Sequence, residues 1–276
     1  MSISAAEVNK LRQMTGAGLM DCKQALSENN GDFEAAIDFL RKKGAKIAAK
    51  RADREATEGA VVAKTNSEGT VGVVIVLSCE TDFVAKNEGF VSFAHEIADT
   101  AIAHKPATAE ELKALTVGSV TLEARLMEEV AKIGEKIDVV KYEIIEGANL
   151  VPYIHGANRM GVLVELSNAP SEANIAAGKD VAMQIAAMNP VAVDRDGVDA
   201  TTIERELEIG REQARQEGKP EAMIDKIAEG KLQKFYKEST LLNQEFVKDS
   251  SKTVAAMLSS IEAGLTVKQF KRVQLG

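Results

Sequence analysis

A hairpin followed by a helix occurs twice in this chain, roughly 90 positions apart, and this repeat constrains the fold more than any other feature. The first copy reads as two strands within Gly59–Leu77, joined by a turn at Asn66–Gly69. The second reads as two strands within Leu150–Leu166, joined at Gly156–Asn158. Because short hairpins pair antiparallel strands, the chain is predicted to be α+β, with a core of two hairpin-plus-helix subdomains and antiparallel sheets.

The apolar spacing after each hairpin predicts a helix with one buried face. The residues expected to point inward are Phe93, Ile97 and Ile102 in the first helix, and Val181, Ile185 and Met188 in the second. The span between the two copies predicts a further helix at Leu122–Ile133 and a strand at Val139–Ile145.

A phenylalanine stands in a polar loop at the end of the first hairpin. The apolar run Val73–Leu77 leads into Ser78–Asn87, where Phe83 follows Asp82. Only 4% of the residues are aromatic, so large rings are scarce for the core. A ring in such a loop is a candidate for insertion into a partner, and the alternative is that Phe83 folds back and caps its own core.

The N-terminal residues predict a small bundle of three helices. Ser4 and Glu7 have capping-box spacing, and the glycine-containing turn Thr15–Gly18 ends the first helix. The turn Asn29–Asp32 separates the second helix from the third. The residues expected inside the bundle include Leu19, Cys22 and Leu26 from the second helix, and Phe33, Ile37 and Leu40 from the third.

Two later segments are strongly charged. Residues 41–54 carry seven basic side chains and one acid, which predicts a basic linker helix with a solvated face; an RNA contact is the alternative, without aromatic residues to support it. In Ile203–Glu238, 17 of 36 residues are charged, and two apolar-spaced runs flank Gly218–Pro220. This predicts a protruding antiparallel helical hairpin. The hairpin serves self-association or a partner contact, or it is a surface feature without a binding role.

The composition excludes several classes of protein. The 276 residues are 45% hydrophobic, as in globular proteins, and the net charge of −8 disfavours general binding to nucleic acid. Cys22 and Cys79 lack the spacing of a zinc site or a disulfide framework. Neither a signal segment nor an apolar stretch approaching 18 residues is present, so the protein is expected to be cytoplasmic, with no membrane contact.

Catalytic and nucleotide-binding motifs are incomplete. Gly178-Lys179 is followed by Asp180 where a phosphate-binding loop requires Ser or Thr, so direct nucleotide binding is not expected. Asp99 stands where a zinc protease has its second histidine, and Cys79 lies beside Glu80, which opposes a reactive thiolate. The chain is therefore not expected to be an enzyme, to have catalytic residues, or to bind a metal or cofactor.

Motifs from residue 8 to about residue 272 resemble those of the bacterial elongation factor Ts family, in the same order. They are Leu11-Arg12, Thr15–Lys23, Ala49–Arg51, Arg54–Gly59, Cys79–Val84, Lys132–Glu135, Tyr153–Gly156, Ala182–Pro190, Phe246–Asp249 and Ser251–Val254. Members of that family bind the GTPase elongation factor Tu and release its GDP. The resemblance therefore implies a guanine nucleotide exchange factor whose N-terminal helices form a ubiquitin-associated-like domain.

The resemblance also implies which residues contact the partner. Those that dislocate the partner's Mg²⁺ would be Thr81, Asp82, Phe83 and Val84. Further contacts would be made by Met20, Lys23, Ile133, Gly134, His155, Phe246 and Val247. The family's glycine-rich turn after His155 is Ala157-Asn158 here, and the alternative role for this histidine is a local bond in the turn.

The expected organisation combines these readings. The predicted domains are 1–55, the three-helix partner-docking domain with its basic linker; 56–148, the first core subdomain; 149–195 with 233–263, the second; 196–232, the hairpin; and 264–276, a short C-terminal module. Elongation factor Tu is the expected partner, with a homodimer through the hairpin as an additional assembly. The rival functions are an RNA-binding accessory factor and a structural scaffold.

Overall fold

The computed structural model describes residues 3–276, which fold into two compact units. The first unit comprises the chain up to Val62 together with Ile75–Ile144 and Val273–Gly276; the second comprises Ala63–Val74 and Ile145–Arg272. Helices and small antiparallel sheets alternate along the chain, so the α+β prediction is confirmed.

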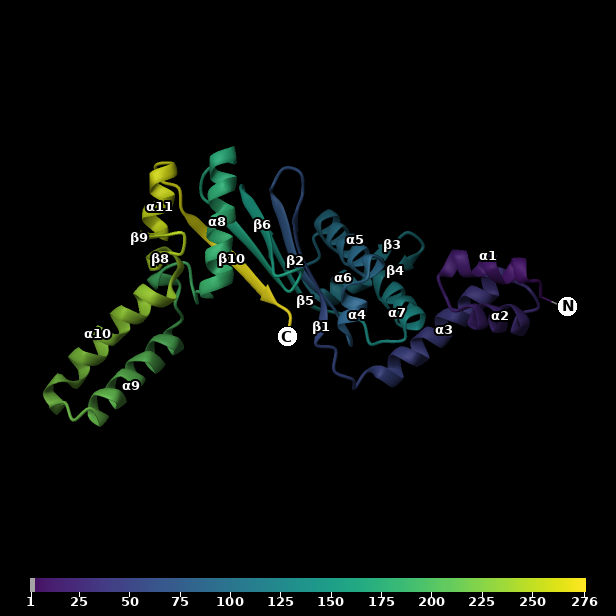
Figure 1. The fold of residues 1–276 in the computed structure, drawn as a ribbon, viewed down its shortest axis with the longest axis horizontal. Helices are drawn as coiled ribbons and strands as arrows, with labels where there is room; N and C mark the ends of the chain where they lie inside the picture. Colours follow the sequence, from purple (N-terminus) through teal and green to yellow (C-terminus); the bar gives the residue numbers. More distant parts are fainter. Residues whose placement is uncertain (1–2) are drawn as a thin grey trace. The chain divides into compact units, whose positions relative to one another are not determined.

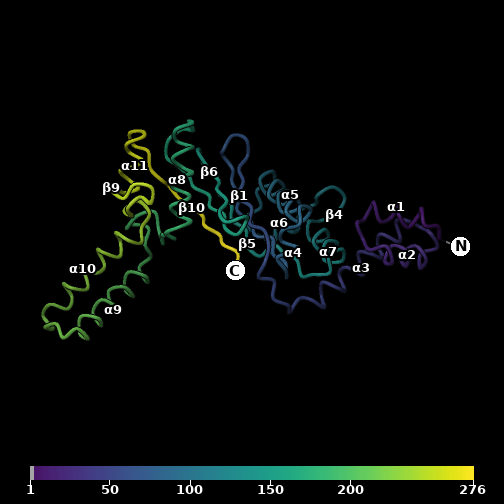
Figure 2. The backbone as a smooth tube through the Cα atoms, viewed as in Figure 1, coloured from purple at the N-terminus to yellow at the C-terminus, as the bar shows by residue number. Residues whose placement is uncertain are grey.

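Three helices form the N-terminal part of the first unit, α1 (Ala5–Thr15), α2 (Leu19–Glu28) and α3 (Phe33–Arg51), as Figure 2 shows. The capping box is confirmed: the Glu7 amide donates to Ser4 Oγ at 3.2 Å, and the Ser4 amide donates to the Glu7 carboxylate at 2.7 Å. Gly16 ends α1 with φ +67°, a left-handed conformation that costs glycine little.

The bundle buries most of the predicted residues. Leu11, Cys22, Leu26 and Leu40 lie in its interior, with Phe33 and Ile37 packed against them. The prediction for Leu19 is wrong, because its side chain is 47% exposed. Leu19 is the first residue of α2, and Cys22, Ala25 and Leu26 from the next turns fill the space between the helices.

The basic stretch forms the second half of α3, and one side of it packs on α7 (Leu122–Ile133). A Cβ at Gly44 would lie 2.8 Å from the Met127 carbonyl oxygen, so only glycine permits this approach. Arg41 Nε donates to Glu128 Oε1 at 2.8 Å and strengthens the contact. The predicted linker helix is thus attached to the core along part of its length.

The predicted hairpin Gly59–Leu77 is confirmed as β1 (Glu58–Thr65) and β2 (Val71–Cys79), which share a sheet with β5 (Asp138–Glu146) in the order β1-β2-β5. All nine residues of β2 are buried. The other elements of this part are α4 (Asp82–Ala85), α5 (Glu88–His104), α6 (Ala109–Ala114), β3 (Thr116–Val117) and β4 (Val120–Thr121). Helix α5 buries Phe93 and Ile97 as expected, with Ile102 half-buried.

The second predicted hairpin is confirmed as β6 (Leu150–His155) and β7 (Met160–Leu166), paired antiparallel from Leu150 opposite Glu165 to His155 opposite Met160. Helix α8 (Glu172–Met188) packs on both strands, and a Cβ at Gly178 would lie 2.6 Å from Val151 Cγ2. Val181 and Ile185 are buried, but Met188 is 48% exposed, against the prediction, because it is the last residue of α8 and projects beyond the strands' contact.

The chain's end completes the sheet of the second hairpin. The strand β10 (Val267–Gln274) pairs with β7 in the order β10-β7-β6, so the residues expected to form a short C-terminal module join an existing sheet. Before it come β8 (Glu245–Phe246), β9 (Asp249–Thr253) and α11 (Val254–Ile261), with short 3-10 helices at Arg195–Gly197 and Leu241–Asn243. Helix α11 packs against α8 within the second unit.

The predicted helical hairpin is confirmed as α9 (Ala200–Gln216) and α10 (Glu221–Ser239), which run side by side in Figure 1. Its seam is narrow and apolar, and consists of Gly210, Ala214, Ile224, Ala228 and Leu232. A Cβ at Gly210 would lie 3.0 Å from Ala228 Cα, so the helices are in close contact there. Within residues 3–276, no helix combines the length and apolar character needed to cross a membrane.

Candidate partner-binding site

Phe83 lies on the surface, on the one-turn helix α4. Its side chain is 84% exposed, so the alternative that it caps its own core is wrong. Thr81 caps α4 by accepting a hydrogen bond from the Val84 amide at 3.4 Å. The ring is therefore presented to solvent by a short helix with a defined start.

The loop before α4 is fastened by Glu135, which follows the C-terminal cap of α7. Glu135 Oε2 accepts hydrogen bonds from the amides of Glu80 and Thr81, each at 3.0 Å. Glu135 Oε1 accepts a third from Thr81 Oγ1 at 2.6 Å. Three donors on one carboxylate hold Glu80 and Thr81, the two residues that precede α4.

Glu80 makes the reciprocal connection. Its carboxylate accepts from the Lys136 amide at 2.6 Å and pairs with Arg51 at 2.7 Å and Arg54 at 3.1 Å. Burial raises the pKa of Glu80, but these hydrogen bonds and charges outweigh it and hold the pKa below its ordinary value. Glu80 therefore stays ionised and ties the loop to the end of α3.

Asp82 is oriented by a neighbour on its own helical turn. Lys86 Nζ donates to Asp82 Oδ2 at 2.6 Å, and this hydrogen bond lowers the pKa of the carboxyl group. Both side chains are substantially exposed, at 49% for Asp82 and 76% for Lys86. Asp82 thus presents an ionised carboxylate beside the Phe83 ring, and water or a partner can reach it.

The structure brings a second predicted contact to this loop. Ile133 and Gly134 are half-buried at the end of α7, where Gly134 has φ +82° and caps the helix. The next residue is Glu135, so the Glu135 hydrogen bonds join this helix end to Thr81. Val84, half-buried on α4, belongs to the same surface. Residues 81–84 and 133–134 are therefore held together in the first unit, and we call this candidate surface the wedge site.

The remaining predicted residue pair in the first unit lies on α2. Met20 is 70% exposed, and Lys23 is exposed one turn later. Asp21 between them pairs with Lys43 of α3 at 2.8 Å, which fixes the start of α2. Met20 thus presents a large apolar side chain on the surface, and Lys23 presents a positive charge close to it.

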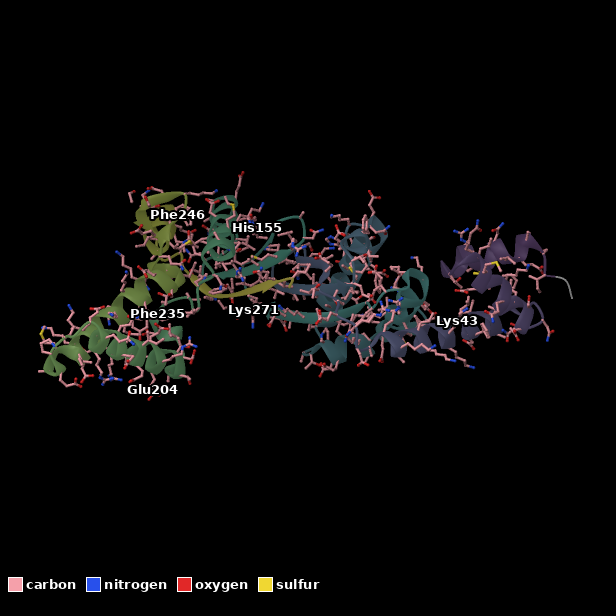
Figure 3. All side chains as sticks on the ribbon, turned by 60° about the horizontal axis from the view of Figure 1, so that its bottom comes forward. Lys43, His155, Glu204, Phe235, Phe246 and Lys271 are labelled. Carbon is pink, nitrogen blue, oxygen red and sulfur yellow. The ribbon has the colours of Figure 1, made fainter. Side chains whose placement is uncertain are left out.

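His155 is exposed at the end of β6 in the second unit (Figure 3). Its Nδ1 lies 3.1 Å from the Tyr153 hydroxyl, so the local bond considered for this histidine is present. The turn after it has left-handed backbone at Gly156, Ala157 and Asn158, with φ between +50° and +65°. Ala157 and Asn158 therefore adopt a left-handed conformation that glycine adopts at little cost.

Phe246 and Val247 differ in accessibility. The Phe246 side chain is only 5% exposed and belongs to the core of the second unit, so its ring does not offer a contact to a partner; Figure 3 marks its place. Its position in a Phe-Val pair on a short strand gave no sign of which side chain points inward. Val247 is 48% exposed, and its amide donates to Gln184 Oε1 at 2.8 Å. Phe246 therefore anchors the segment from which Val247 projects.

The thiol of Cys79 lies beside the wedge site. Burial, reinforced by the charge of Glu135, raises the pKa of Cys79 to about 12. The same thiol ionises near 9 when it is accessible, so above that pH the unfolded chain binds fewer protons than the folded one. Stability from this group is complete below pH 9 and is lost as the pH rises towards 12.

We therefore expect the free energy of unfolding to fall between about pH 8 and about pH 10.5, and to fall less in Cys79→Ala. Urea denaturation at both pH values measures this. The wild-type protein and Cys79→Ala share all other titrating groups, so an equal loss in both would contradict the assignment to Cys79.

Sequence reasoning missed Glu80 and Glu135 as parts of the site. Glu135 ends the string Lys132–Glu135, which pointed only to Ile133 and Gly134, and Glu80 precedes Thr81 directly. A charged residue next to each assigned contact was the available signal. Among residues 3–276, no group of three or more His, Cys, Asp or Glu side chains could hold a metal ion.

Comparison with known proteins identifies the family. The family model described as elongation factor TS matches residues 80–276. Over the full chain, the protein is 55% identical to the elongation factor Ts of Amoebophilus asiaticus, with 100% of both chains covered. It is 53% identical to that of Cytophaga hutchinsonii, with 99% of each chain covered, and 51% identical to that of Flavobacterium psychrophilum, with 100% of this chain and 99% of the relative covered. The chain therefore belongs to the elongation factor Ts family.

Proposed function

We propose that this protein acts in translation elongation in the cytoplasm, as a guanine nucleotide exchange factor that binds elongation factor Tu and promotes release of its GDP. Family membership supports the role in elongation. The observation that carries the mechanism is the 84% exposure of Phe83 on a loop fastened by Glu135. A protein with few aromatic residues gains nothing in its own fold from a ring held in solvent.

In the proposed mechanism, this protein and GDP favour two different conformations of the GTPase. Phe83 enters between two helices of the partner's nucleotide domain, with Asp82 beside it, and favours a conformation with a weak hold on Mg²⁺ and GDP. Because binding is reciprocal, bound GDP weakens the affinity for this protein by the same factor. The chain performs no chemical step, needs no cofactor and does not itself bind nucleotide in this proposal.

One ring is insufficient for this task. Burial of a phenylalanine contributes about 1.5–3 kcal/mol, or about one to two orders of magnitude in an equilibrium. Additional contacts are proposed at Met20 and Lys23, at Ile133 and Gly134, at His155 and at Val247. The exposure of Met20 and Val247 supports their inclusion, since both have apolar area to bury in a complex.

The direct test is the release of fluorescent GDP from elongation factor Tu, measured with and without this protein in the presence of excess unlabelled nucleotide. We expect faster release that saturates with protein concentration and depends on Phe83. The RNA-binding alternative instead predicts no acceleration together with retention of RNA at physiological salt. A scaffold predicts neither effect.

We also propose that the outer part of the α9–α10 hairpin mediates self-association. Ile209 is 43% exposed and Met223 is 49% exposed, although the rest of the hairpin surface is densely charged. Two exposed apolar side chains on a projecting pair of helices can be buried by a second copy of the chain. The buried seam already joins the two helices, so the exposed residues are not needed for it.

Replacing residues 211–227 by a short Gly-Ser linker, which removes Met223, together with Ile209→Ser, should remove this association without unfolding the protein. The cut ends lie together because Gly210 packs against Ala228. The melting temperature should change by no more than about 3 °C, because α9 and α10 pack mainly on each other. Sedimentation velocity should show a shift to monomer; an unchanged sedimentation profile, or a collapse in melting temperature, would contradict this role.

A further inference from the structure

Two loops of the first unit are joined by hydrogen bonds in which a carboxylate of each loop accepts from backbone amides of the other. Glu135, from the loop after α7, accepts from the amides of residues 80 and 81. Glu80, from the loop after β2, accepts from the amide of Lys136 at 2.6 Å. Each carboxylate therefore satisfies backbone donors of the opposite loop, and neither loop can shift along the other without leaving donors unpaired.

A continuous chain of bonds leads from Glu135 to the exposed ring. Thr81 Oγ1 donates to Glu135 Oε1 at 2.6 Å and accepts from the Val84 amide, and this second bond caps the start of α4. Phe83 lies in the middle of α4, a helix of only four residues that has little stability of its own. The direction of the ring thus depends on the Thr81 cap, and the orientation of the cap depends on Glu135.

We propose that Glu135 is a positioning residue for Phe83, which holds the ring in the orientation required for insertion into the GTPase. This inference rests on the proposed exchange function. Glu135 itself need not touch the partner, because its two oxygens are already engaged by three donors of its own chain. Pre-ordering the loop reduces the conformational entropy lost on binding, so its removal should weaken exchange without removing any contact surface.

A carboxylate suits this position better than an amide. All three groups that face Glu135 are donors in the observed geometry, and an ionised carboxylate has only acceptors. In Glu135→Gln, the side-chain oxygen can still accept from the two amides, but the NH₂ group faces Thr81 Oγ1. Because an NH₂ group only donates, Thr81 Oγ1 would have to accept this hydrogen bond instead of donating it. Glu135→Ala removes all three acceptors. The expected order of exchange activity is therefore wild type, Glu135→Gln, Glu135→Ala.

The test measures fluorescent GDP release for the full-length variants at a temperature where circular dichroism shows each to be folded. Glu135→Ala should reduce the rate at subsaturating protein by at least about fivefold, and Glu135→Gln by less. The matched control is Glu129→Ala on α7, where the carboxylate pairs with Lys132 of the same helix at 3.2 Å. This substitution should change the rate by less than about twofold.

A double-mutant cycle with Phe83→Ala separates positioning from general support of the fold. If Glu135 acts through the ring, Glu135→Ala should add less than about twofold to the loss caused by Phe83→Ala. Stability changes of the two substitutions should still add. The proposal would be overturned if the fold-reduction in the GDP release rate of the double variant equalled the product of the two single fold-reductions. An unchanged rate in Glu135→Ala would overturn it as well.

A second variant keeps the test decisive if Glu135→Ala fails to fold. Thr81→Val removes the hydroxyl link and preserves side-chain volume, so it should slow exchange, and Thr81→Ser should restore it. Equal rates for these two variants would overturn the proposal. If the wild-type protein does not accelerate GDP release, the proposed exchange function is wrong. If the wild-type protein accelerates release and the Glu135 and Thr81 variants do so equally well, only the positioning role is wrong.

Discussion

Phe83→Ala is expected to slow catalysed GDP release from elongation factor Tu by at least about tenfold, with a change in unfolding free energy below about 1 kcal/mol. The ring is 84% exposed in the free protein, so its removal creates no cavity. In the proposed complex the same ring is buried, and losing about 1.5 kcal/mol of burial corresponds to about tenfold in rate at subsaturating protein. Stopped-flow release of fluorescent GDP and urea denaturation measure the two quantities.

A buried phenylalanine nearby provides the control. Phe90 of α5 is only 2% exposed, so Phe90→Ala should destabilise the fold by about 3–5 kcal/mol, the opposite pattern. Asp82→Ala should weaken exchange and leave the protein folded, because its carboxylate is 49% exposed and pairs with the exposed Lys86. A stable Phe83→Ala protein with wild-type exchange would contradict the wedge mechanism.

The local structure of this chain was largely predictable because its signals are short-range. The Ser4 and Glu7 pattern marked the start of α1, the turns at residues 66–69 and 156–158 marked both hairpins, and α7 spans the predicted Leu122–Ile133. Such signals depend on backbone conformation and side chains within a few residues. They are therefore present in the sequence whatever the tertiary packing.

Solvent exposure at the candidate site was not predictable in the same way. The position of Phe83 after a buried strand is compatible with a ring folded inward or outward, and only the tertiary arrangement decides between them. Here the loop before Phe83 is held by Glu135, which is 54 positions from Thr81 along the chain. Hydrogen bonds between such distant residues leave no periodic signal in a single sequence.

Errors at Leu19, Met188 and Phe246 have a related origin. Leu19 and Met188 are end residues of α2 and α8, where the helical spacing continues but the facing element does not. Phe246 shows the reverse case, because a residue expected at the surface lies in the core. Its ring packs in the core while the Val247 side chain beside it is exposed.

The N-terminal bundle is expected to contribute to exchange as a separate docking element, so deletion of residues 1–50 should reduce GDP release at subsaturating protein by at least about tenfold. The deletion removes Met20, whose 70% exposed side chain is a proposed contact, and retains Arg51 and its pairing with Glu80. The wedge site therefore keeps its salt bridge, and the loss reports mainly on the bundle.

The core of the bundle favours this interpretation. Leu11, Cys22, Ala25, Leu26 and Ala36 form a cluster of buried residues that lies wholly within the three helices. The bundle therefore has a core of its own, so the remainder should stay folded when the bundle is removed. Circular dichroism and urea denaturation of the truncated protein test this directly.

Full-length Met20→Ala separates a lost contact from a loosened scaffold. Burial of Met20 against the partner would contribute about 1.5–3 kcal/mol, so this single substitution should reproduce much of the deletion's effect on exchange with little change in stability. Glu34→Ala, at an exposed position of α3, is the matched control and should leave exchange unchanged. Wild-type exchange in the truncated protein would show that the bundle does not dock on the partner. A large loss in the truncation together with none in Met20→Ala would assign the effect to the support that α3 gives α7.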